Sequence, residues 1–530
     1  MSFTEFNQTK CAMKIKIPLI LFILMAIAFS CLYKTIFDSK IDINGDDSSY
    51  FLLAKSLSQG KGYVVASDKY MQAHNHFPVG YPFLMALFMK LSPSLGFMKV
   101  LNGIFLFGSV FLVYLIQLRI TKSHLLFIPI LLLCFTNFYL LKYSTITMSE
   151  VPYMFFSVAG IFLFLQVKDF EGDLLKNYRF YLLILVSVIT LYIRTVGLSL
   201  ILALTIAFIL KRRFKIAQIY FISTILMYAP WVLRAKIMNL GNPYLEAFYY
   251  KNPYDLSLGK IGIYDLWLRF LENLERYISM EIPEALFPYL TIGYDDKGNA
   301  LSEYAIGIVC AVIFLFYIIK NVKNDNLVII LYVVLTYCIL LIWPSQWFGV
   351  RFMLPLIPLL YFAIVTSLRQ FLGFIFTNNY EKIPNYVAVV LSFLFFSVAA
   401  KKPKRSEIES RQCISSLIDE SKKNHSPAYS NFFKVAEYCR IHLPDTAIVS
   451  SRKPAMFAIY SGGYTCSFPN VADEKVFREH FKNAKYVVVD QLGYNSTSKY
   501  LVPFINGHPQ DFEQVAIFKE PDTYLFRYNK

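Results

Sequence analysis

The chain has 530 residues, 56% of them hydrophobic, and a formal net charge of +16. Length alone would suggest about three soluble domains, but uncharged runs long enough to cross roughly 30 Å of hydrocarbon recur along most of the chain. This composition excludes an ordinary soluble protein. The positive charge lies mostly in short loops between apolar runs, so it indicates membrane topology and not a nucleic-acid partner.

The first apolar run, residues 17–37, follows Lys10, Lys14 and Lys16. It is too long for the apolar region of a signal peptide and lacks a convincing cleavage site, so we predict an uncleaved anchor with a cytoplasmic N-terminus. Similar runs recur as far as residue 400. About eleven membrane helices are expected, near residues 17–37, 98–118, 124–142, 151–167, 179–193, 195–210, 216–236, 303–319, 327–343, 350–368 and 384–400.

The run from Phe180 to Leu210 decides this number. As a single helix it would be about 46 Å long, which exceeds the bilayer without steep tilt. A break near Arg194, with Gly197 just after it, makes two short spans and keeps the basic stretch "KRRFK" (211–215) on the cytoplasmic side. The unbroken alternative places that stretch outside, so we favour the break.

With this topology, three long segments lie outside the cytoplasm: a first outer loop (38–97), a second outer loop (238–302) and the tail (401–530). We expect a membrane domain over residues 1–400 and a small extracytoplasmic α/β domain over the tail. The basic start of the tail, "KKPKR", breaks the charge rule, which is weak for a long translocated domain.

The tail has the pattern of a small mixed domain. The stretch "YSNFFKVAEYCRIHL" has helical periodicity, whereas "TAIVSS", "KYVVVD" and "TYLFRY" are typical of strands bounded by turns. Cys413, Cys439 and Cys466 lie here, and they would allow one disulfide without requiring it.

The first outer loop contains an acidic pair, Asp46 and Asp47, in "NGDDSSYFLLAKSLSQGKGY" (44–63). Apolar residues at helical spacing predict an amphipathic helix over 48–58 that ends at Gly60. One reading is that an aspartate only caps this helix. The other is that one carboxylate takes the proton of an acceptor hydroxyl while its neighbour orients that acceptor or holds a metal. The two readings are compatible.

Several stretches carry a resemblance to a known family. They are "DDSSYFLLAKSLSQGKGY", "HNHFPVGYPFLMAL" (74–87), "YSTITMSEVPYMFF" (143–156), "YIRTVGLSL" (192–200), "APWVLRAKIMNLGNPY" (229–244) and "RFMLPLIPLLYF" (351–362). In this order, the chain resembles the GT-C superfamily of polyprenyl-phosphate-sugar glycosyltransferases over roughly residues 15–400. The match is to the branch of protein mannosyltransferases, lipid A aminoarabinose transferases and rhizobial lipopolysaccharide sugar transferases. In the tail, "IVSSRKP" and "KYVVVD" resemble, less specifically, outer domains appended to such enzymes.

The resemblance implies a GT-C type α-helical polytopic membrane protein whose catalytic base is Asp46, with Asp47 beside it. Asp47 stands where the family usually has glutamate. The implied donor is a sugar on a polyprenyl phosphate, and the implied reaction is an inverting displacement at the anomeric carbon. A lipid carrier suits this side of the membrane because nucleotide sugars are not available outside the cytoplasm.

Three arginines, Arg194, Arg234 and Arg351, lie at predicted outer span ends and at family-motif positions. A departing phosphate requires fixed positive charge, and arginine supplies it with two parallel donors. The alternative for each is an interfacial anchor whose charge reaches the headgroups. Arg194 has a further argument, because it interrupts an apolar run where an unpaired charge is costly.

Four more residues are candidates for the site. Glu150 would bind substrate or a metal, or would only begin a helix with Pro152. His76, with His74 two residues before it, would ligate a metal, contact a ligand hydroxyl or phosphate, or lie in an exposed loop. Tyr50 would line the site or pack in the core.

The sequence therefore predicts a multi-pass cell-membrane glycosyltransferase that moves one sugar from a polyprenyl-phosphate donor to an extracytoplasmic glycolipid, polysaccharide or protein. No metal site and no cofactor is required by the sequence, although a divalent cation is compatible with it. Two alternatives from other classes are a transporter or flippase of lipid-linked sugars and a non-catalytic membrane assembly subunit. A transporter would be expected to carry charges near mid-bilayer and related halves, and the sequence shows neither.

Overall fold

The structure is a computed structural model. It describes residues 3–43, 45–253, 258–289, 301–375, 385–387, 389–390 and 413–530, with side chains from residue 17 onward. Contacts divide the chain into two compact units. The helical unit comprises Met1–Asp38, Lys99–Thr145 and Ser149–Ser421, and the mixed unit comprises Ser39–Met98, Ile146–Met148 and Lys422–Lys530.

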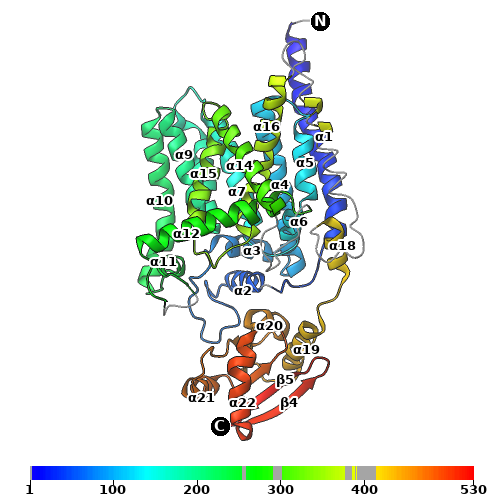
Figure 1. Ribbon diagram of the computed structural model, residues 1–530, viewed down its shortest axis with the longest axis vertical. Helices are drawn as coiled ribbons and strands as arrows, with labels where there is room; N and C mark the ends of the chain where they lie inside the picture. Colours follow the sequence, from blue (N-terminus) through cyan, green and yellow to red (C-terminus); the bar gives the residue numbers. More distant parts are fainter. Residues whose placement is uncertain are drawn as a thin grey trace. The chain divides into compact units, whose positions relative to one another are not determined.

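The helical unit is a bundle of apolar helices that run side by side, as Figure 1 shows. Six described helices are long and apolar enough to cross a membrane, or seven if one bent pair counts as a single span. The described apolar helices are α1 (Phe3–Ile36), α4 (Leu95–Thr121), α5 (Phe127–Thr136), α6 (Phe138–Ser144), α7 (Glu150–Val167), α8 (Tyr178–Ile193), α9 (Leu198–Leu210), α10 (Phe214–Ile237), α14 (Leu301–Asn321), α15 (Leu327–Leu341) and α16 (Ile357–Ile375). The number eleven stays a prediction, and most of its last span, 384–400, lies outside the described residues.

The predicted break in the run 180–210 is confirmed. Helix α8 ends at Ile193, Arg194 has an extended backbone, and a short 3₁₀ turn (Thr195–Gly197) leads into α9. A Cβ on Gly197 would lie 2.9 Å from backbone atoms of Leu191, so only glycine fits this tight reversal.

A second broken span lies at residues 127–144, where α5 and α6 meet at 64°. Asn137 is at the bend. Its side chain accepts a hydrogen bond from the Leu140 N–H at 2.9 Å and donates to Ala285 O at 2.7 Å and to the Tyr361 hydroxyl at 2.9 Å. The bend is therefore held by a buried amide that satisfies freed backbone groups, as the membrane interior requires.

The second outer loop, predicted over 238–302, contains short helices: α11 (Pro243–Tyr249), α12 (Ile263–Arg276), a π-helical turn (Tyr277–Glu281) and α13 (Ile282–Leu286). In Figure 1, α12 lies across the direction of the bundle helices. One face of α12 exposes Tyr264 and Trp267, while the other buries Arg269 and Asn273. The Asn273 amide donates to the main-chain oxygens of Leu341, the last residue of α15, and of Trp343 just after it, which fixes α12 on the bundle.

The mixed unit contains a five-stranded sheet of order β2-β1-β3-β5-β4. The strands are β1 (Ile448–Ser450), β2 (Tyr464–Cys466), β3 (Tyr486–Val489), β4 (Phe512–Phe518) and β5 (Thr523–Tyr528). The first three are parallel, and the β4–β5 hairpin adds antiparallel to β3. The predicted strands correspond to β1, β3 and β5, and the predicted helix to α19 (Pro427–His442), whereas β2 and β4 were missed.

Residues 39–98 belong to this same unit. They form α2 (Asp46–Ser58) and α3 (Gly80–Met89), so the predicted amphipathic helix is confirmed. Ile41 packs in a cluster with residues of α19, and the Thr465 N–H donates to Ser67 O at 3.0 Å. The predicted boundary between residues 400 and 401 lies outside the described residues, and Cys413, Cys439 and Cys466 are free, so the disulfide that the sequence allowed does not form.

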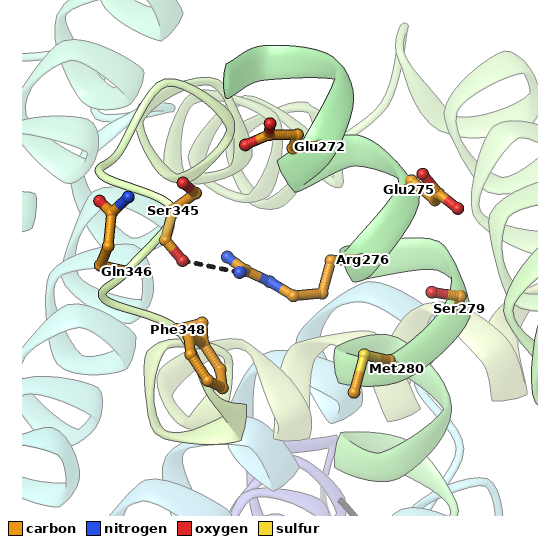
Figure 2. Close-up of a pocket in the computed structure, with 8 residues that line it drawn as sticks. All are labelled: Glu272, Glu275, Arg276, Ser279, Met280, Ser345, Gln346 and Phe348. Atoms are coloured by element: carbon orange, nitrogen blue, oxygen red, sulfur yellow. Dashed lines mark hydrogen bonds between the residues drawn. The ribbon is translucent and has the colours of Figure 1, made fainter. Parts of the chain in front are cut away.

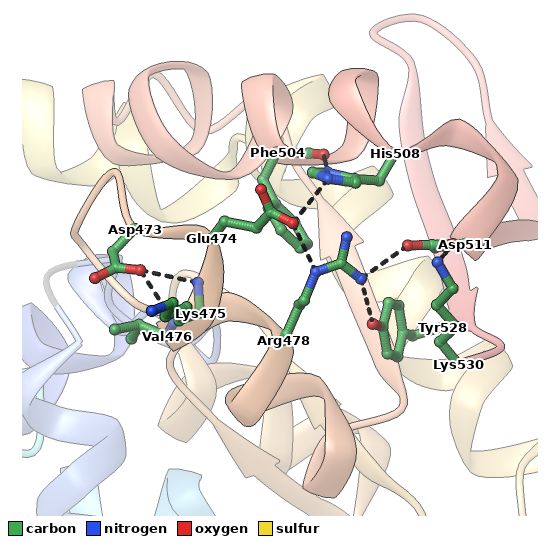
Figure 3. A network of polar contacts seen from close by, with 10 residues as sticks. All are labelled: Asp473, Glu474, Lys475, Val476, Arg478, Phe504, His508, Asp511, Tyr528 and Lys530. Carbon is green, nitrogen blue, oxygen red and sulfur yellow. Dashed lines mark hydrogen bonds and ion pairs between the residues drawn. The ribbon is translucent and has the colours of Figure 1, made fainter.

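A polar network links the segments beside β4 and β5, as Figure 3 shows. Arg478, on α21 (Glu474–Asn483), lies 2.7 Å from Glu474 and 3.2 Å from Asp511, and Lys530 approaches Asp511 at 2.9 Å. Asp511 is buried, and hydrogen bonds from Lys530 and Arg478 hold the pKa of its carboxyl below the usual range. The network thus joins α21 to the turn before β4 and to the end of β5.

Candidate functional site

The acidic pair divides into two different environments at the start of α2. Asp47 is fully buried, and its carboxylate accepts hydrogen bonds from the N–H groups of Asp42 at 3.0 Å and Ser48 at 2.7 Å. The side chain therefore fixes the shape of its own loop. The N-cap position of α2 is Gly45, with φ of 95°, and the Asp47 carboxylate accepts the free N–H of Ser48 in the first turn, so Asp47 fixes the loop and caps the helix start together.

Asp46 is only half-buried, and it is the first residue of α2, where the helix dipole stabilises a negative charge. His76 is near enough for its pKa to respond. Protein atoms around the imidazole lower the pKa of His76, and the Asp46 carboxylate opposes that shift. Part of the ring is exposed to solvent, so the lowering is moderated by water. The Asp46 carboxylate therefore acts electrostatically on His76, and the catalytic and binding roles of the two residues stay predictions.

Two other candidates of this loop have packing roles. Tyr50 is buried, with its ring centroid 4.6 Å from that of Phe77 and 5.2 Å from that of Tyr81. His74 accepts a hydrogen bond from the Phe77 N–H at 3.0 Å. Both residues pack against Phe77, which directly follows His76 in the chain.

A second group forms in the helical unit. Glu150, the first residue of α7, is 1% exposed and lies 2.6 Å from Arg194. The guanidinium of Arg194 also donates to the Ser149 hydroxyl at 3.0 Å and lies 5.9 Å from the ring centroid of Phe352. Arg351 lies over the same ring at 5.1 Å. Two of the three predicted arginines therefore share one aromatic ring.

This geometry assigns different roles to the two charges. The Glu150 carboxylate holds the Arg194 side chain in place and neutralises most of its positive charge within the protein. The role predicted for Glu150 as a substrate or metal ligand stays a prediction, but its observed contact is to Arg194. The contact predicted between Arg351 and a phosphate stays a prediction.

Arg234 lies in the last turn of α10, with its guanidinium 5.0 Å from the ring centroid of Trp231. This is the geometry of an aromatic–arginine anchor at a span end. Its predicted convergence with Arg194 and Arg351 stays a prediction.

A cavity of about 530 Å³ opens between α12, the π-helical turn and the segment after α15. Figure 2 shows the side chains around it, with the Arg276 guanidinium donating to Ser345 O at 2.7 Å. The lining residues are Glu272, Glu275, Arg276, Ser279, Met280, Ser345, Gln346 and Phe348. The Nε of Arg276 also lies 3.0 Å from the buried Glu281, so this ion pair helps to hold the guanidinium at the cavity.

Sequence reasoning missed this cavity. The available signal was the stretch "DLWLRFLENLERY", in which Glu272, Glu275 and Arg276 recur at helical spacing opposite an apolar face. Only folding brings Ser345 and Phe348 to the same place.

The described residues do not form a metal site. No group of three His, Cys, Asp or Glu side chains within the described ranges is placed to hold a metal ion. The divalent cation that the sequence allows stays a prediction, and no step is assigned to one.

No protein-family model and no curated protein matches the chain. Solved structures do. ArnT from Cupriavidus metallidurans bound to undecaprenyl phosphate is similar with a TM-score of 0.61 and 11% identity, over 95% of this chain and 97% of that one. The apo state of ArnT has a TM-score of 0.57 and 12% identity, over 96% and 97%. An Archaeoglobus fulgidus oligosaccharyltransferase in complex with Zn and sulfate has a TM-score of 0.54 and 12% identity, over 91% of this chain and 69% of that one.

Both neighbours belong to the GT-C superfamily. The chain has the GT-C fold. The predicted resemblance and the predicted fold class, a polytopic helical membrane protein with a small α/β domain, are confirmed. Identities of 11–12% show the GT-C fold and no more, so the roles of individual residues depend on the geometry described above.

Proposed function

We propose that this protein is a membrane glycosyltransferase that moves one sugar from a polyprenyl-phosphate donor to an acceptor outside the cytoplasm. The observation that carries the proposal is the half-buried Asp46 at the N-terminus of α2, next to His76 and on a loop fixed by Asp47, within a GT-C fold. Undecaprenyl phosphate bound to the similar ArnT supports a donor of this chemical class.

In the proposed reaction, Asp46 accepts the proton of the acceptor hydroxyl as its oxygen attacks the anomeric carbon. The bond between that carbon and the phosphate oxygen breaks, the configuration inverts, and polyprenyl phosphate leaves. His76 orients the acceptor or the carboxylate, and Arg351 stabilises the negative charge that develops on the phosphate. The Arg194 guanidinium, which Glu150 holds in place, offers hydrogen-bond donors in a fixed orientation.

The cavity of the helical unit offers the kinds of contact that a sugar ring makes. Glu272 and Glu275 offer carboxylate oxygens to sugar hydroxyls, whereas Met280 and Phe348 offer apolar contact to a ring face. For the sugar and for the acceptor, the proposal names the chemical class and not the individual compound.

The test is Asp46→Asn in the full chain. We expect the rate of sugar transfer from the lipid-linked donor to surface glycans to fall by about 10³-fold or more. The variant loses the general base, whereas the asparagine amide keeps the shape of the side chain. Membrane insertion and abundance should not change. Asp445→Asn, an exposed aspartate of the same unit, is the matched control.

The measurement is mass spectrometry of surface glycolipids and glycans for a single-sugar increment. A transporter or an assembly subunit would keep its cellular activity in Asp46→Asn. Unchanged transfer in that variant would overturn the proposed function.

A further inference from the structure

In the sheet of the mixed unit, the edge formed by the carboxyl ends of β1 and β3 has the topology of a ligand site. Strands β1 and β3 are adjacent and parallel, with Val449 paired to Tyr486. From β1 the chain continues through α20 (Pro454–Ser461) to β2 on one side, whereas from β3 it continues to β4 on the other side. In open α/β sheets, the crevice outside the carboxyl ends of two such strands is the usual ligand position.

Polar atoms without hydrogen-bond partners gather in the segments that leave these two strands. Among the described residues they are Ser451 Oγ, Arg452 Nε, Asp490 Oδ2, Ser496 Oγ and Thr497 Oγ1. Ser451 is fully buried and Asp490 is 4% exposed. Folded proteins leave few buried polar groups unsatisfied, so this cluster calls for partners from a bound molecule.

The charged side chains and the aromatic ring at this edge indicate the chemical class of that molecule. The Arg452 guanidinium lies 4.8 Å, and the Lys453 ammonium 4.9 Å, from the ring centroid of Tyr494. Asp490 faces Arg452, and burial raises the pKa of the Asp490 carboxyl to about 6. Although burial alone would raise it, hydrogen bonds and charges from Lys453, Tyr429 and Arg452 lower the pKa of Tyr494.

A carboxylate, two cations, hydroxyls and an aromatic ring together match a hydroxyl-rich ligand that carries negative charge. Sugar hydroxyls both donate to a carboxylate and accept from a guanidinium, and a pyranose face packs on a tyrosine ring. The guanidinium of Arg452 offers two parallel donors to an acidic group of that sugar.

This edge borders the loop that carries Asp46. The Lys453 ammonium donates to Ile43 O at 3.3 Å, and a Cβ on Gly45 would lie 3.4 Å from the same nitrogen. A ligand held at Arg452 and Asp490 would therefore be close to the loop of the general base.

We propose that the carboxyl edge of β1 and β3 binds an acidic saccharide unit of the acceptor, through Arg452, Asp490 and Tyr494. This inference rests on the proposed function for its link to transfer, but the binding itself does not depend on catalysis. Lys453 is a positioning residue that joins this edge to the loop before α2.

The experiment measures binding of glucose 6-phosphate, glucuronate and glucose to the full chain in detergent micelles, without any donor. We expect at least one of the acidic sugars to bind at least 10-fold more tightly than glucose. Arg452→Gln should abolish that preference, and Asp490→Asn should weaken binding of all three sugars. Lys482→Gln, an exposed lysine of α21, should change nothing.

A second measurement needs no variant: an acidic sugar should slow hydrogen exchange in wild-type peptides that cover residues 451–454 and 490–497. Neither acidic sugar binding more tightly than glucose, or unchanged exchange in these peptides, would overturn the inference. Binding without any sugar transfer would contradict only the proposed function, and transfer without binding would contradict only this inference.

Discussion

Two predicted site residues of the helical unit, Arg194 and Glu150, form an ion pair whose side chains are 18% and 1% exposed. Removing the arginine would leave a buried carboxylate without its cation, which costs about 3–5 kcal/mol in comparable proteins. We therefore predict that Arg194→Gln lowers the thermal stability of the detergent-solubilised chain strongly.

The double variant Arg194→Gln/Glu150→Gln is the matched control, because it removes both charges at once. It should recover most of the lost stability in the same thermal unfolding assay. Equal destabilisation in the single and double variants would show that the ion pair does not hold this part of the site together.

Asp490 makes the stability of the mixed unit depend on pH. Its folded-state pKa, raised by burial to about 6, exceeds the ordinary value of 3.8, so the folded state binds a proton more tightly than the unfolded one. The contribution of Asp490 to stability is therefore complete below pH 3.8 and decreases as pH rises through 6, by about 3 kcal/mol at most. We predict that hydrogen exchange in peptides of β3, corrected for intrinsic rates, speeds up more between pH 4.5 and pH 7.5 in the wild type than in Asp490→Asn.

Asp490→Asn should remove this dependence and stabilise the unit at neutral pH. The gain at neutral pH is the pattern expected of a residue kept for binding at some cost in stability. A variant whose β3 peptides exchange with the same pH dependence as the wild type would contradict the assignment to Asp490.

At the scale of elements, α14 packs against the π-helical turn through Gly307. A Cβ at Gly307 would lie 1.7 Å from the carbonyl oxygen of Ile278, and the next two residues, Ser279 and Met280, line the cavity. We predict that Gly307→Ala displaces the turn, destabilises the chain by about 1–3 kcal/mol and lowers transfer activity.

The matched control is Gly373→Ala in α16, where nothing lies within 4 Å of the added Cβ. This substitution should stabilise the helix by up to about 1 kcal/mol, because alanine has the higher helix propensity. Melting temperatures of the two variants decide the matter: similar values would mean that α14 does not press on the turn.

At the scale of the whole molecule, the mixed unit joins segments that are far apart in sequence. Residues 39–98 and 422–530 share a core through Ile41, Phe432 and Val488. We predict that a chain ending at residue 421 loses transfer activity, because the Asp46 loop loses the core and the Lys453 contact that support it.

Limited proteolysis measures this effect directly. Trypsin should cleave the truncated chain at Lys55, Lys61 or Lys69 at least 10-fold faster than the full chain, while cleavage within the bundle stays the same. Unchanged protection of these lysines would show that residues 39–98 hold their shape without the C-terminal segment.

Much of this architecture follows from the sequence alone, because it depends on local patterns. Apolar runs of membrane length predict the bundle helices, a charge followed by Gly197 predicts the break after α8, and short strand-like runs bounded by turns predict β1, β3 and β5. These features need no knowledge of which distant segments meet.

Only the tertiary structure decided which side chains share an environment. It buried Asp47 among backbone amides, gave Arg194 to Glu150, and placed Arg194 and Arg351 over Phe352. It also built the cavity beside Arg276 and set Arg452 against Asp490 and Tyr494. The physical reason is that burial and electrostatic pairing depend on contacts between segments separated by tens to hundreds of residues, and no local periodicity encodes them.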